Sequence, residues 1–342
     1  MKNLIIGVDL ATKEIQVCVY ANKKVHSNRE MTPSQFSDYL ANLSPSLIVF
    51  ESCAGSNYWN QLATELGHQS RLISPRLVSV IRQNQKTDKN DALAIIQASQ
   101  LPDIKFVSGK TNSQQQAQSM LKLREQAIKQ KTALKNQLKG LMREFNLPVG
   151  RSHQSFILMI ELTLEDAENG LKSEFRHMLN TSLDLYLVLC KAIESYDDLL
   201  NQWVCQSSEC KKFMKIEGIG KLNAMHLYIG LDSGELGQFK KGKDAAACIG
   251  LTPLQHSSGG KVKLGSIGKR KNTSLRSLLI TGAMSVAQQV VKREPRTSKE
   301  AWLKSLIDRR GKKCAAVALA NKNVRTAFSI LRNQTEYRAV TL

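Results

Sequence analysis

The chain has 342 residues, 42% of them hydrophobic, and its 49 Lys and Arg against 29 Asp and Glu give a net charge of +20. This length exceeds what one small core needs, so we expect two or three domains. No apolar run reaches the roughly 18 residues of a membrane span, and the segment after Met1 lacks the basic region and cleavage site of a secretory signal. These features exclude a membrane protein and predict a cytoplasmic one.

The positive charge is concentrated in the last third of the chain. Residues 236–342 contain 22 Lys and Arg against 5 Asp and Glu, whereas residues 1–235 contain 27 against 24. Such a field suits a polyphosphate partner, because neutralising phosphates releases condensed counterions. A solubilising surface rarely needs this asymmetry. We therefore predict that the protein binds nucleic acid.

The seven cysteines are odd in number, scattered, and form no CxxC pair. We interpret them as reduced thiols in the core of a cytosolic protein. They are Cys18, Cys53, Cys190, Cys205, Cys210, Cys248 and Cys314. Because no Cys/His cluster occurs, a zinc site is not expected.

In residues 1–105, short apolar runs alternate with helical patterns. The runs are LIIGVDL, IQVCVYA, LIVFE and SRLIS, and the helical stretches cover about 57–66 and 86–100. This alternation predicts an α/β domain with a mixed sheet.

Residues 106–209 contain two long amphipathic helical patterns, over about 112–145 and 183–204. Their apolar residues repeat every three to four positions, which favours a coiled-coil hairpin or dimerisation arm. Residues 105–150 carry 9 basic and 2 acidic side chains, and residues 152–210 carry 3 and 10. Opposite charge either brings the two helices together or leaves the basic one for nucleic acid. The link over 148–180 is expected to be irregular.

Residues 210–342 are predicted to be mainly helical, with helices over 273–291 and 315–332 around a Gly-rich and Lys-rich loop at 257–272. The expected fold class is therefore α/β followed by α.

Two acids follow apolar runs in the first domain. Asp9 ends LIIGVD and Glu51 ends LIVFE. An unpaired charge at the end of a buried strand is expensive, so a carboxylate there usually serves a purpose. The alternative is that each lies just past the sheet in solvent or caps a helix.

Two further acids, Asp88 and Asp91, lie three residues apart in KTDKNDALAII, on one face of a helix. The same pattern resembles a helix start with Asp88 as its N-cap. Both readings hold only if the cap is Thr87 or an earlier residue.

Taken together, the four acids predict a site for Mg²⁺, with Mn²⁺ as a substitute, since hard carboxylate oxygens suit these ions. Two such ions about 4 Å apart stabilise the attacking and leaving oxygens of a phosphoryl transfer.

The loop GLTPLQHSSGGKVKLGSIGKRKN combines hydroxyls, glycines and cations that suit close approach to a phosphate backbone. Taken alone, Ser257 and Ser258 before two glycines indicate a flexible turn. A nucleophilic serine would need groups that stabilise a pentacovalent phosphate. The candidate cations for phosphate contact are Lys261, Lys263, Lys269, Arg270, Lys271 and Arg276.

Upstream, KIEGIGKLNAMHLYIGL has the shape of a helix-hairpin-helix. Gly218, Gly220 and Lys221 would present backbone N–H groups and a cation to a phosphate, which grips a duplex independently of its sequence. The alternative is an ordinary turn between two helices.

The ordered segments VD, FESCAGSNYW, KTDKNDA, EGIG, GLTPLQHSSGG and GKRKNTSLRSLL resemble the DEDD-type insertion-sequence transposases, relatives of the Piv-type DNA invertases. The resemblance runs nearly end to end. It departs from the family in GSIGKRKN, where many relatives have a serine near Gly268 and a glycine near Lys271.

This resemblance implies an N-terminal RNase H-like, RuvC-like domain, a coiled-coil arm and a C-terminal transposase domain. It implies that Asp9, Glu51, Asp88 and Asp91 bind the metal and that Ser258, with Ser257 as the adjacent alternative, attacks the DNA. It also implies a structured guide RNA that pairs with target and donor DNA, a homodimer that assembles into a tetramer, and residence at a prokaryotic nucleoid.

Two other functions compete with a strand-exchanging recombinase. One is a junction-resolving endonuclease that uses the same acids and a metal-activated water. The other is a non-catalytic nucleic-acid-binding protein in which the acids are structural.

Overall fold

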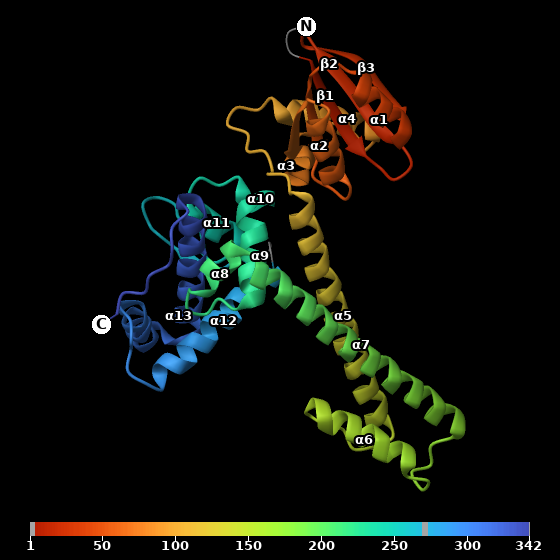
Figure 1. Ribbon diagram of the computed structural model, residues 1–342, viewed down its shortest axis with the longest axis vertical. Helices are drawn as coiled ribbons and strands as arrows, with labels where there is room; N and C mark the ends of the chain where they lie inside the picture. Colours follow the sequence, from red (N-terminus) through yellow and green to blue (C-terminus); the bar gives the residue numbers. More distant parts are fainter. Residues whose placement is uncertain (1–3, 269–272, 342) are drawn as a thin grey trace. The chain divides into compact units, whose positions relative to one another are not determined.

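The computed structural model describes residues 4–268 and 273–341 (Figure 1). The chain divides into two compact units. One contains residues 116–207, and the other combines residues 1–115 with residues 208–342.

The N-terminal domain is built on a five-stranded mixed sheet with the order β3-β2-β1-β4-β5. Its strands are β1 (Ile5–Leu10), β2 (Ile15–Ala21), β3 (Lys24–Met31), β4 (Leu47–Glu51) and β5 (Gln69–Ile73). The pairs β1–β2 and β2–β3 are antiparallel, whereas β1–β4 and β4–β5 are parallel. The predicted mixed sheet is confirmed. Edge strand β3 was not predicted because KVHSNREM contains no apolar run.

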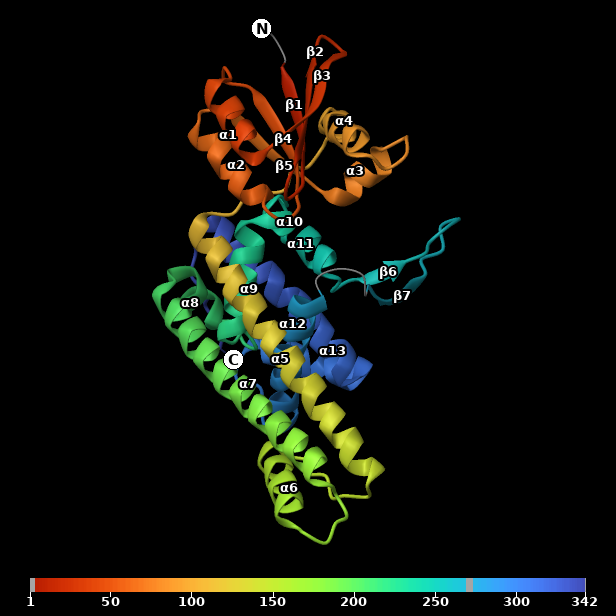
Figure 2. The ribbon, with the colours of Figure 1, turned by 90° about the vertical axis from the view of Figure 1, so that its right-hand side faces the viewer.

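Two helices cover each face of this sheet (Figure 2). Helices α1 (Pro33–Asn42) and α2 (Ser56–Glu65) pack on the face of Ile6, Val8 and Phe50. Helices α3 (Pro75–Ile81) and α4 (Asp88–Ser99) pack on the face of Val49 and Ile73. The sequence predicted α2 and α4, but not α1 and α3.

Helix α4 lies unusually close to strand β1 at Gly7. A Cβ atom at Gly7 would meet the carbonyl oxygen of Ala92 at 2.5 Å and the side chain of Ile96 at 2.6 Å. No residue with a side chain fits there without moving the helix. Gly7 therefore fixes how near the first turns of α4 come to the strand that carries Asp9.

The arm consists of α5 (Asn112–Glu144), α6 (His153–Glu165) and α7 (Ser173–Gln206). The two predicted long helices are present, but α6 was missed in the link expected to be irregular. A capping box between Ser152 and Ser155 starts this helix, and Phe156 and Ile160 bury its apolar face. Residues of all three helices form one hydrophobic core, which differs from a coiled coil of the two long helices alone. The coiled coil therefore stays a prediction.

The opposite charges of the long helices meet at one ion pair in the arm. Arg124 donates from Nε and Nη2 to the two carboxylate oxygens of Asp197, at 2.5 and 3.2 Å. This contact favours the first of the two readings, in which opposite charge brings α5 and α7 together.

The C-terminal domain is mainly helical, as predicted. Its helices are α8 (Ser208–Met214), α9 (Lys221–Asp232), α10 (Gly234–Gly237), α11 (Gly242–Ile249), α12 (Thr273–Val291) and α13 (Ser298–Asn333). A short hairpin of β6 (Pro253–Gln255) and β7 (Leu264–Ile267) forms within the segment predicted to be a loop.

Helix α13 is two helical limbs joined at a sharp kink. Gly311 has φ 77° and ψ 161°, a conformation that is open essentially to glycine alone. The limbs fold back on each other, since the Lys322 ammonium lies 4.5 Å from the ring centroid of Trp302, twenty positions earlier. The kink thus turns a long helical sequence into a helical hairpin.

The cysteine prediction is only partly right. None of the seven cysteines forms a disulfide, but only Cys18 and Cys210 are buried, while Cys53, Cys205 and Cys314 are exposed. Cysteine composition does not reveal which side of a helix or loop the thiol occupies.

Within residues 4–268 and 273–341, no helix is long and apolar enough to cross a membrane.

We predict that Gly311→Ala lowers the free energy of unfolding by about 1–3 kcal/mol, because alanine is strained at this φ and ψ. Urea unfolding followed by circular dichroism measures the change. Gly140→Ala is the matched control, since Gly140 lies inside α5 with open space around it. That control should gain up to about 1 kcal/mol from helix propensity. Equal gains in both variants would contradict the account of the kink.

Candidate active site

Asp9 and Glu51 lie at the carboxyl ends of the interior strands β1 and β4, on the face of the sheet covered by α4. Strands β1 and β4 are parallel neighbours in which Val8 pairs with Phe50, so the two acids occupy adjacent positions at their carboxyl ends. Side chains alternate along a strand, and Gly7 faces α4. Asp9 therefore shares that face, as does Glu51, two residues after Val49 of the α3–α4 core.

Asp88 and Asp91 belong to the first turn of α4. The N-cap is Thr87, whose hydroxyl accepts from the Asn90 N–H at 3.3 Å, so the reading of Asp88 as the cap is wrong. Asp88 is exposed. Asp91 is only 7% exposed and accepts from Arg82 Nη1 at 2.7 Å.

The electrostatics indicate that the four carboxylates lie near one another. Burial raises the pKa of Asp9, and the charges of Asp91 and Asp88 raise it further. Burial likewise raises the pKa of Glu51, followed by the charges of Asp9 and Asp91. Lys86 opposes both shifts. A cluster of like charges that resist ionisation is typical of a functional site.

In the described part of the chain, no group of three or more His, Cys, Asp or Glu side chains is arranged to hold a metal ion. The donor chemistry nevertheless suits a divalent cation, because the acids supply hard oxygens whose mutual repulsion a cation would relieve. The side-chain oxygen of Gln16 fits the same purpose. It is buried without a hydrogen-bond partner among the described residues, on the strand position that pairs with Asp9.

Gln16 and Asn28 were missed by the sequence reasoning. Gln16 is 1% exposed and donates from Nε2 to Asn28 Oδ1 at 2.6 Å. Asn28 in turn donates from Nδ2 to the carbonyl oxygen of Lys89 at 2.9 Å. This chain ties β2 and β3 to the first turn of α4, between Asp88 and Asp91. The available signal was a single polar residue inside the apolar run IQVCVYA.

Arg82 and Lys86 were also missed. Arg82 pairs with Asp91, and the charges of Arg82 and Lys86 lower the pKa of Glu51. They lie in RQNQK, a short polar segment between two helices, and no sequence pattern connects these cations to the acids.

The serine segment forms the tip of the β6–β7 hairpin. Ser258 to Lys261 make a tight turn in which the Lys261 N–H donates to the Ser258 carbonyl at 3.0 Å, with Gly259 and Gly260 at φ 55° and 74°. The two serines differ in their surroundings. The Ser257 hydroxyl accepts from the backbone N–H of Lys263 at 3.1 Å and from Gln255 Nε2 at 3.0 Å.

By contrast, the Ser258 hydroxyl is exposed and makes no hydrogen bond to another described residue, including the four acids. Lys261 and Lys263 are exposed on the same hairpin. Arg276 donates to the carbonyl oxygen of Gly268, which orients its guanidinium at the base of the hairpin. The predicted phosphate contacts Lys269, Arg270 and Lys271 lie outside the described residues.

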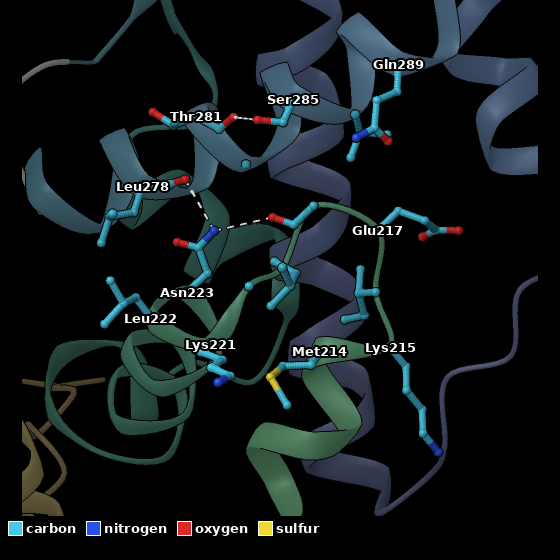
Figure 3. Close-up of a pocket in the computed structure, with 16 residues that line it drawn as sticks. Met214, Lys215, Glu217, Lys221, Leu222, Asn223, Leu278, Thr281, Ser285 and Gln289 are labelled. Atoms are coloured by element: carbon cyan, nitrogen blue, oxygen red, sulfur yellow. Dashed lines mark hydrogen bonds between the residues drawn. The ribbon is translucent and has the colours of Figure 1, made fainter. Parts of the chain in front are cut away.

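The predicted helix-hairpin-helix has the expected local shape, with α8 and α9 joined by a turn at residues 215–220. Gly218 has φ 83°, and Gly220 is the N-cap of α9, followed by exposed Lys221. The turn packs directly on α12, since a Cβ at Gly282 would meet the Gly218 carbonyl oxygen at 2.2 Å. An open groove of about 720 Å³ runs between this turn and α12 (Figure 3).

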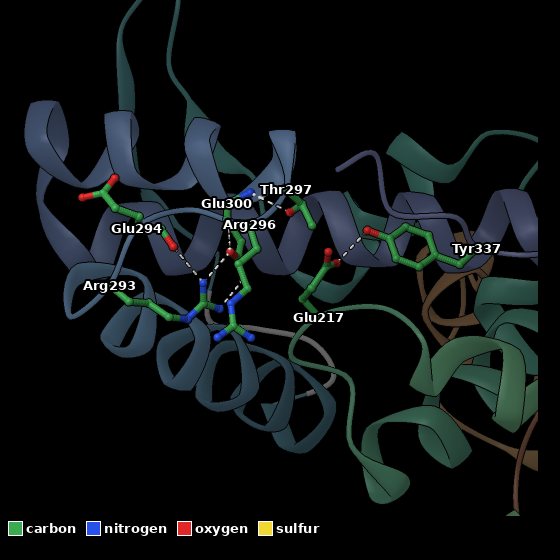
Figure 4. A network of polar contacts seen from close by, with 7 residues as sticks. All are labelled: Glu217, Arg293, Glu294, Arg296, Thr297, Glu300 and Tyr337. Atoms are coloured by element: carbon green, nitrogen blue, oxygen red, sulfur yellow. Dashed lines mark hydrogen bonds and ion pairs between the residues drawn. The ribbon is translucent and has the colours of Figure 1, made fainter. Parts of the chain in front are cut away.

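A partly buried network of polar contacts around Glu217 stabilises the hairpin turn (Figure 4). The Glu217 carboxylate accepts from Lys299 Nζ at 2.9 Å and from the Tyr337 hydroxyl at 2.6 Å, while its backbone carbonyl accepts from Asn323. Burial alone would raise the pKa of Glu217, but the hydrogen bonds from Tyr337 and Lys299 outweigh it and hold the pKa below its usual value. Nearby, Arg293 forms a bidentate ion pair with Glu300.

Models of two protein families match the chain. A family described as transposase, of the DEDD type, matches residues 6–147, which include the four acids. A family described as transposase IS116/IS110/IS902 matches residues 210–299, which include the hairpin turn and Ser258.

Several known protein sequences are similar to the chain over almost its full length. The transposase for insertion sequence element IS1111A of Coxiella burnetii is 36% identical over 99% of this chain and 92% of its own. A probable family 20 transposase of Pseudomonas aeruginosa is 34% identical over 97% and 98%. The transposase for insertion sequence element IS1328 of Yersinia enterocolitica is 28% identical over 97% and 98%.

We predict that Asp9→Asn raises the melting temperature by a few degrees at pH 7 in the presence of a chelator. The folded-state pKa of Asp9 is raised, so its ionised form costs stability at neutral pH, and asparagine removes that cost. The gain should vanish as the pH falls below about 3.9, where the wild-type aspartic acid is protonated in both states.

Differential scanning calorimetry across this pH range measures the effect. Asp38→Asn is the control, because Asp38 is an exposed acid on α1. A lower melting temperature for Asp9→Asn at pH 7 would show that the charge of Asp9 is satisfied in the free protein, contrary to this account.

Proposed function

Because this chain belongs to the DEDD-type IS110 transposases and is a DNA transposase, we propose that it cuts and rejoins DNA through Ser258, assisted by Mg²⁺ at Asp9, Glu51, Asp88 and Asp91. The observation that carries the proposal is the convergence of these four acids on the α4 face of the sheet, where burial raises the pKa of Asp9 and Glu51 and the charges of neighbouring acids raise it further. DNA is the substrate of a transposase. The serine, the metal and the RNA described below are the proposed parts.

In the proposed reaction, Ser258 Oγ attacks a DNA phosphorus atom. An Oγ–P bond forms, the bond from phosphorus to one deoxyribose oxygen breaks, and the serine proton passes to that leaving oxygen. Attack by a hydroxyl of a second strand then reverses the exchange and frees the serine. Each step replaces one phosphodiester with another, so rejoining needs no external energy source. The exposed and unengaged hydroxyl of Ser258 suits this role better than that of Ser257, which holds the hairpin together.

The four acids would hold the divalent cations, which supply positive charge for the attacking and leaving oxygens. Arg82 holds the Asp91 carboxylate in place through their 2.7 Å contact. The Gln16–Asn28–Lys89 connection holds the first turn of α4 against the sheet. Lys261, Lys263 and Arg276 would bind the phosphates that flank the attacked one.

We also propose that a structured RNA chooses the DNA sites, while the protein contacts backbone. The net charge of +17 over residues 236–342 supports a partner with many phosphates. The hairpin turn at Gly218 and Gly220, with Lys221, would contribute a sequence-independent grip. Assembly of two dimers would let Ser258 of one chain and the four acids of another chain form one active site.

Ser258→Ala should abolish a covalent protein–DNA adduct, a loss of more than about a thousandfold, because no other group supplies the attacking oxygen. The adduct is detected on a denaturing gel with labelled donor DNA, purified protein and its bound RNA. Ser257→Ala is the matched control and should keep most of the adduct. A chelator of Mg²⁺ should suppress the adduct in both.

Adduct formation by Ser258→Ala would refute the serine assignment. Cleavage of branched DNA without any adduct would instead favour a junction-resolving endonuclease with a metal-activated water. Adduct formation that survives complete ribonuclease treatment would contradict the role of RNA while leaving the serine chemistry intact.

A further inference from the structure

The kink of α13 carries a cationic corner that the proposed chemistry does not use. Its residues are Arg309, Arg310, Lys312 and Lys313, two on each side of Gly311, and all four are exposed. The single acid beside them is Asp308. The corner lies beyond residues 6–147 and 210–299, the segments that the two family models match.

These four cations have no anionic partner in the described part of the protein. No ion pair or hydrogen bond joins their side chains to another described residue. Four adjacent cations repel one another, so their clustering costs free energy unless an anion offsets it. Some cations of this domain do have such a partner, as Arg293 has in Glu300 and Lys299 in Glu217. The corner therefore retains charge for an external ligand.

The shape of the corner is fixed by contacts far from it along α13. The Lys322 ammonium lies on the Trp302 ring at 4.5 Å, one residue from each limb. Glu217 joins the limbs a second time, since its carboxylate accepts from Lys299 and its backbone carbonyl from Asn323. A Cβ atom built at Gly311 would meet no atom within 4 Å, so the corner itself is open to an external ligand.

From these observations we infer that the corner at Gly311 is a second binding site for duplex DNA, which grips phosphates independently of sequence. The inference rests on the proposed DNA-binding role, but the surface is separate from the acids and from Ser258. Residues 305–315 contain no aromatic side chain, and single strands are usually held by stacking on such side chains. Cations alone suit the regularly spaced phosphates of a duplex.

Fluorescence anisotropy with the full-length protein and two unrelated 30-base-pair DNA duplexes, about three helical turns each, tests the inference across a range of salt concentrations. For Lys312→Gln/Lys313→Gln, the slope of log affinity against log salt should fall by about 2, since each lost phosphate contact changes it by about 0.9. Affinity should fall equally for both sequences. Arg309→Gln/Arg310→Gln should have a similar effect. All four side chains are exposed, and circular dichroism verifies that the variants fold.

Lys23→Gln/Lys24→Gln is the matched control, since it removes two adjacent exposed lysines, one from the turn between β2 and β3 and one from the first position of β3. Its slope should equal that of the wild type. Unchanged slopes in both corner variants would overturn the inference, as would a loss confined to a structured RNA with DNA binding unaltered. Absence of DNA binding by the wild type would instead contradict the proposed function itself.

Discussion

The close packing of α4 on Gly7 is the constraint on which the candidate active site depends. Two of the acids are on strands and two are on a helix, so their separation is set by the distance between helix and sheet. That distance is short because Gly7 presents no side chain to Ala92 and Ile96. The same packing buries Asp9 and Glu51, which raises their pKa, and places like charges beside them, which raises it further. Ionisation of these acids thus lowers the folding stability of the protein at the place where their charge is needed for function.

Glycine plays a related part in the C-terminal domain, at two places with different consequences. Gly218 and Gly282 let the hairpin turn lie directly on α12, which shapes the groove beside Lys221. Gly311 instead lets a helix reverse at a point that is open to solvent. The first arrangement is supported by buried contacts through Glu217, and the second exposes four cations. Both suit a protein that must hold a polyanion against a rigid support.

Sequence reasoning found those parts of the structure whose signal is local. Apolar runs located four of the five strands of the mixed sheet, and periodicity located α5 and α12 closely. It missed β3, which is polar because it is an edge strand, and α6, whose capping box and two buried apolar residues are a weak signal.

Sequence reasoning also left open whether Asp88 caps α4, since Thr87 and Asp88 are both good caps. Only the structure, through the hydroxyl of Thr87, removed that alternative. Asn28 and Arg82 were out of reach because their relation to the acids depends on strand pairing and helix packing, and Gln16 was marked only as a single polar residue inside an apolar run.

Manganese binding to the folded Gly7→Ala variant tests this account most directly, because the substitution keeps all four acids and changes only the space between α4 and β1. Electron paramagnetic resonance of free Mn²⁺ gives the affinity, and circular dichroism verifies folding. The account predicts that wild-type protein binds Mn²⁺ and that Gly7→Ala binds it at least about tenfold more weakly, as when supporting residues of a metal site are altered. Equal affinity in the folded variant, or no Mn²⁺ binding by the wild type, would contradict it.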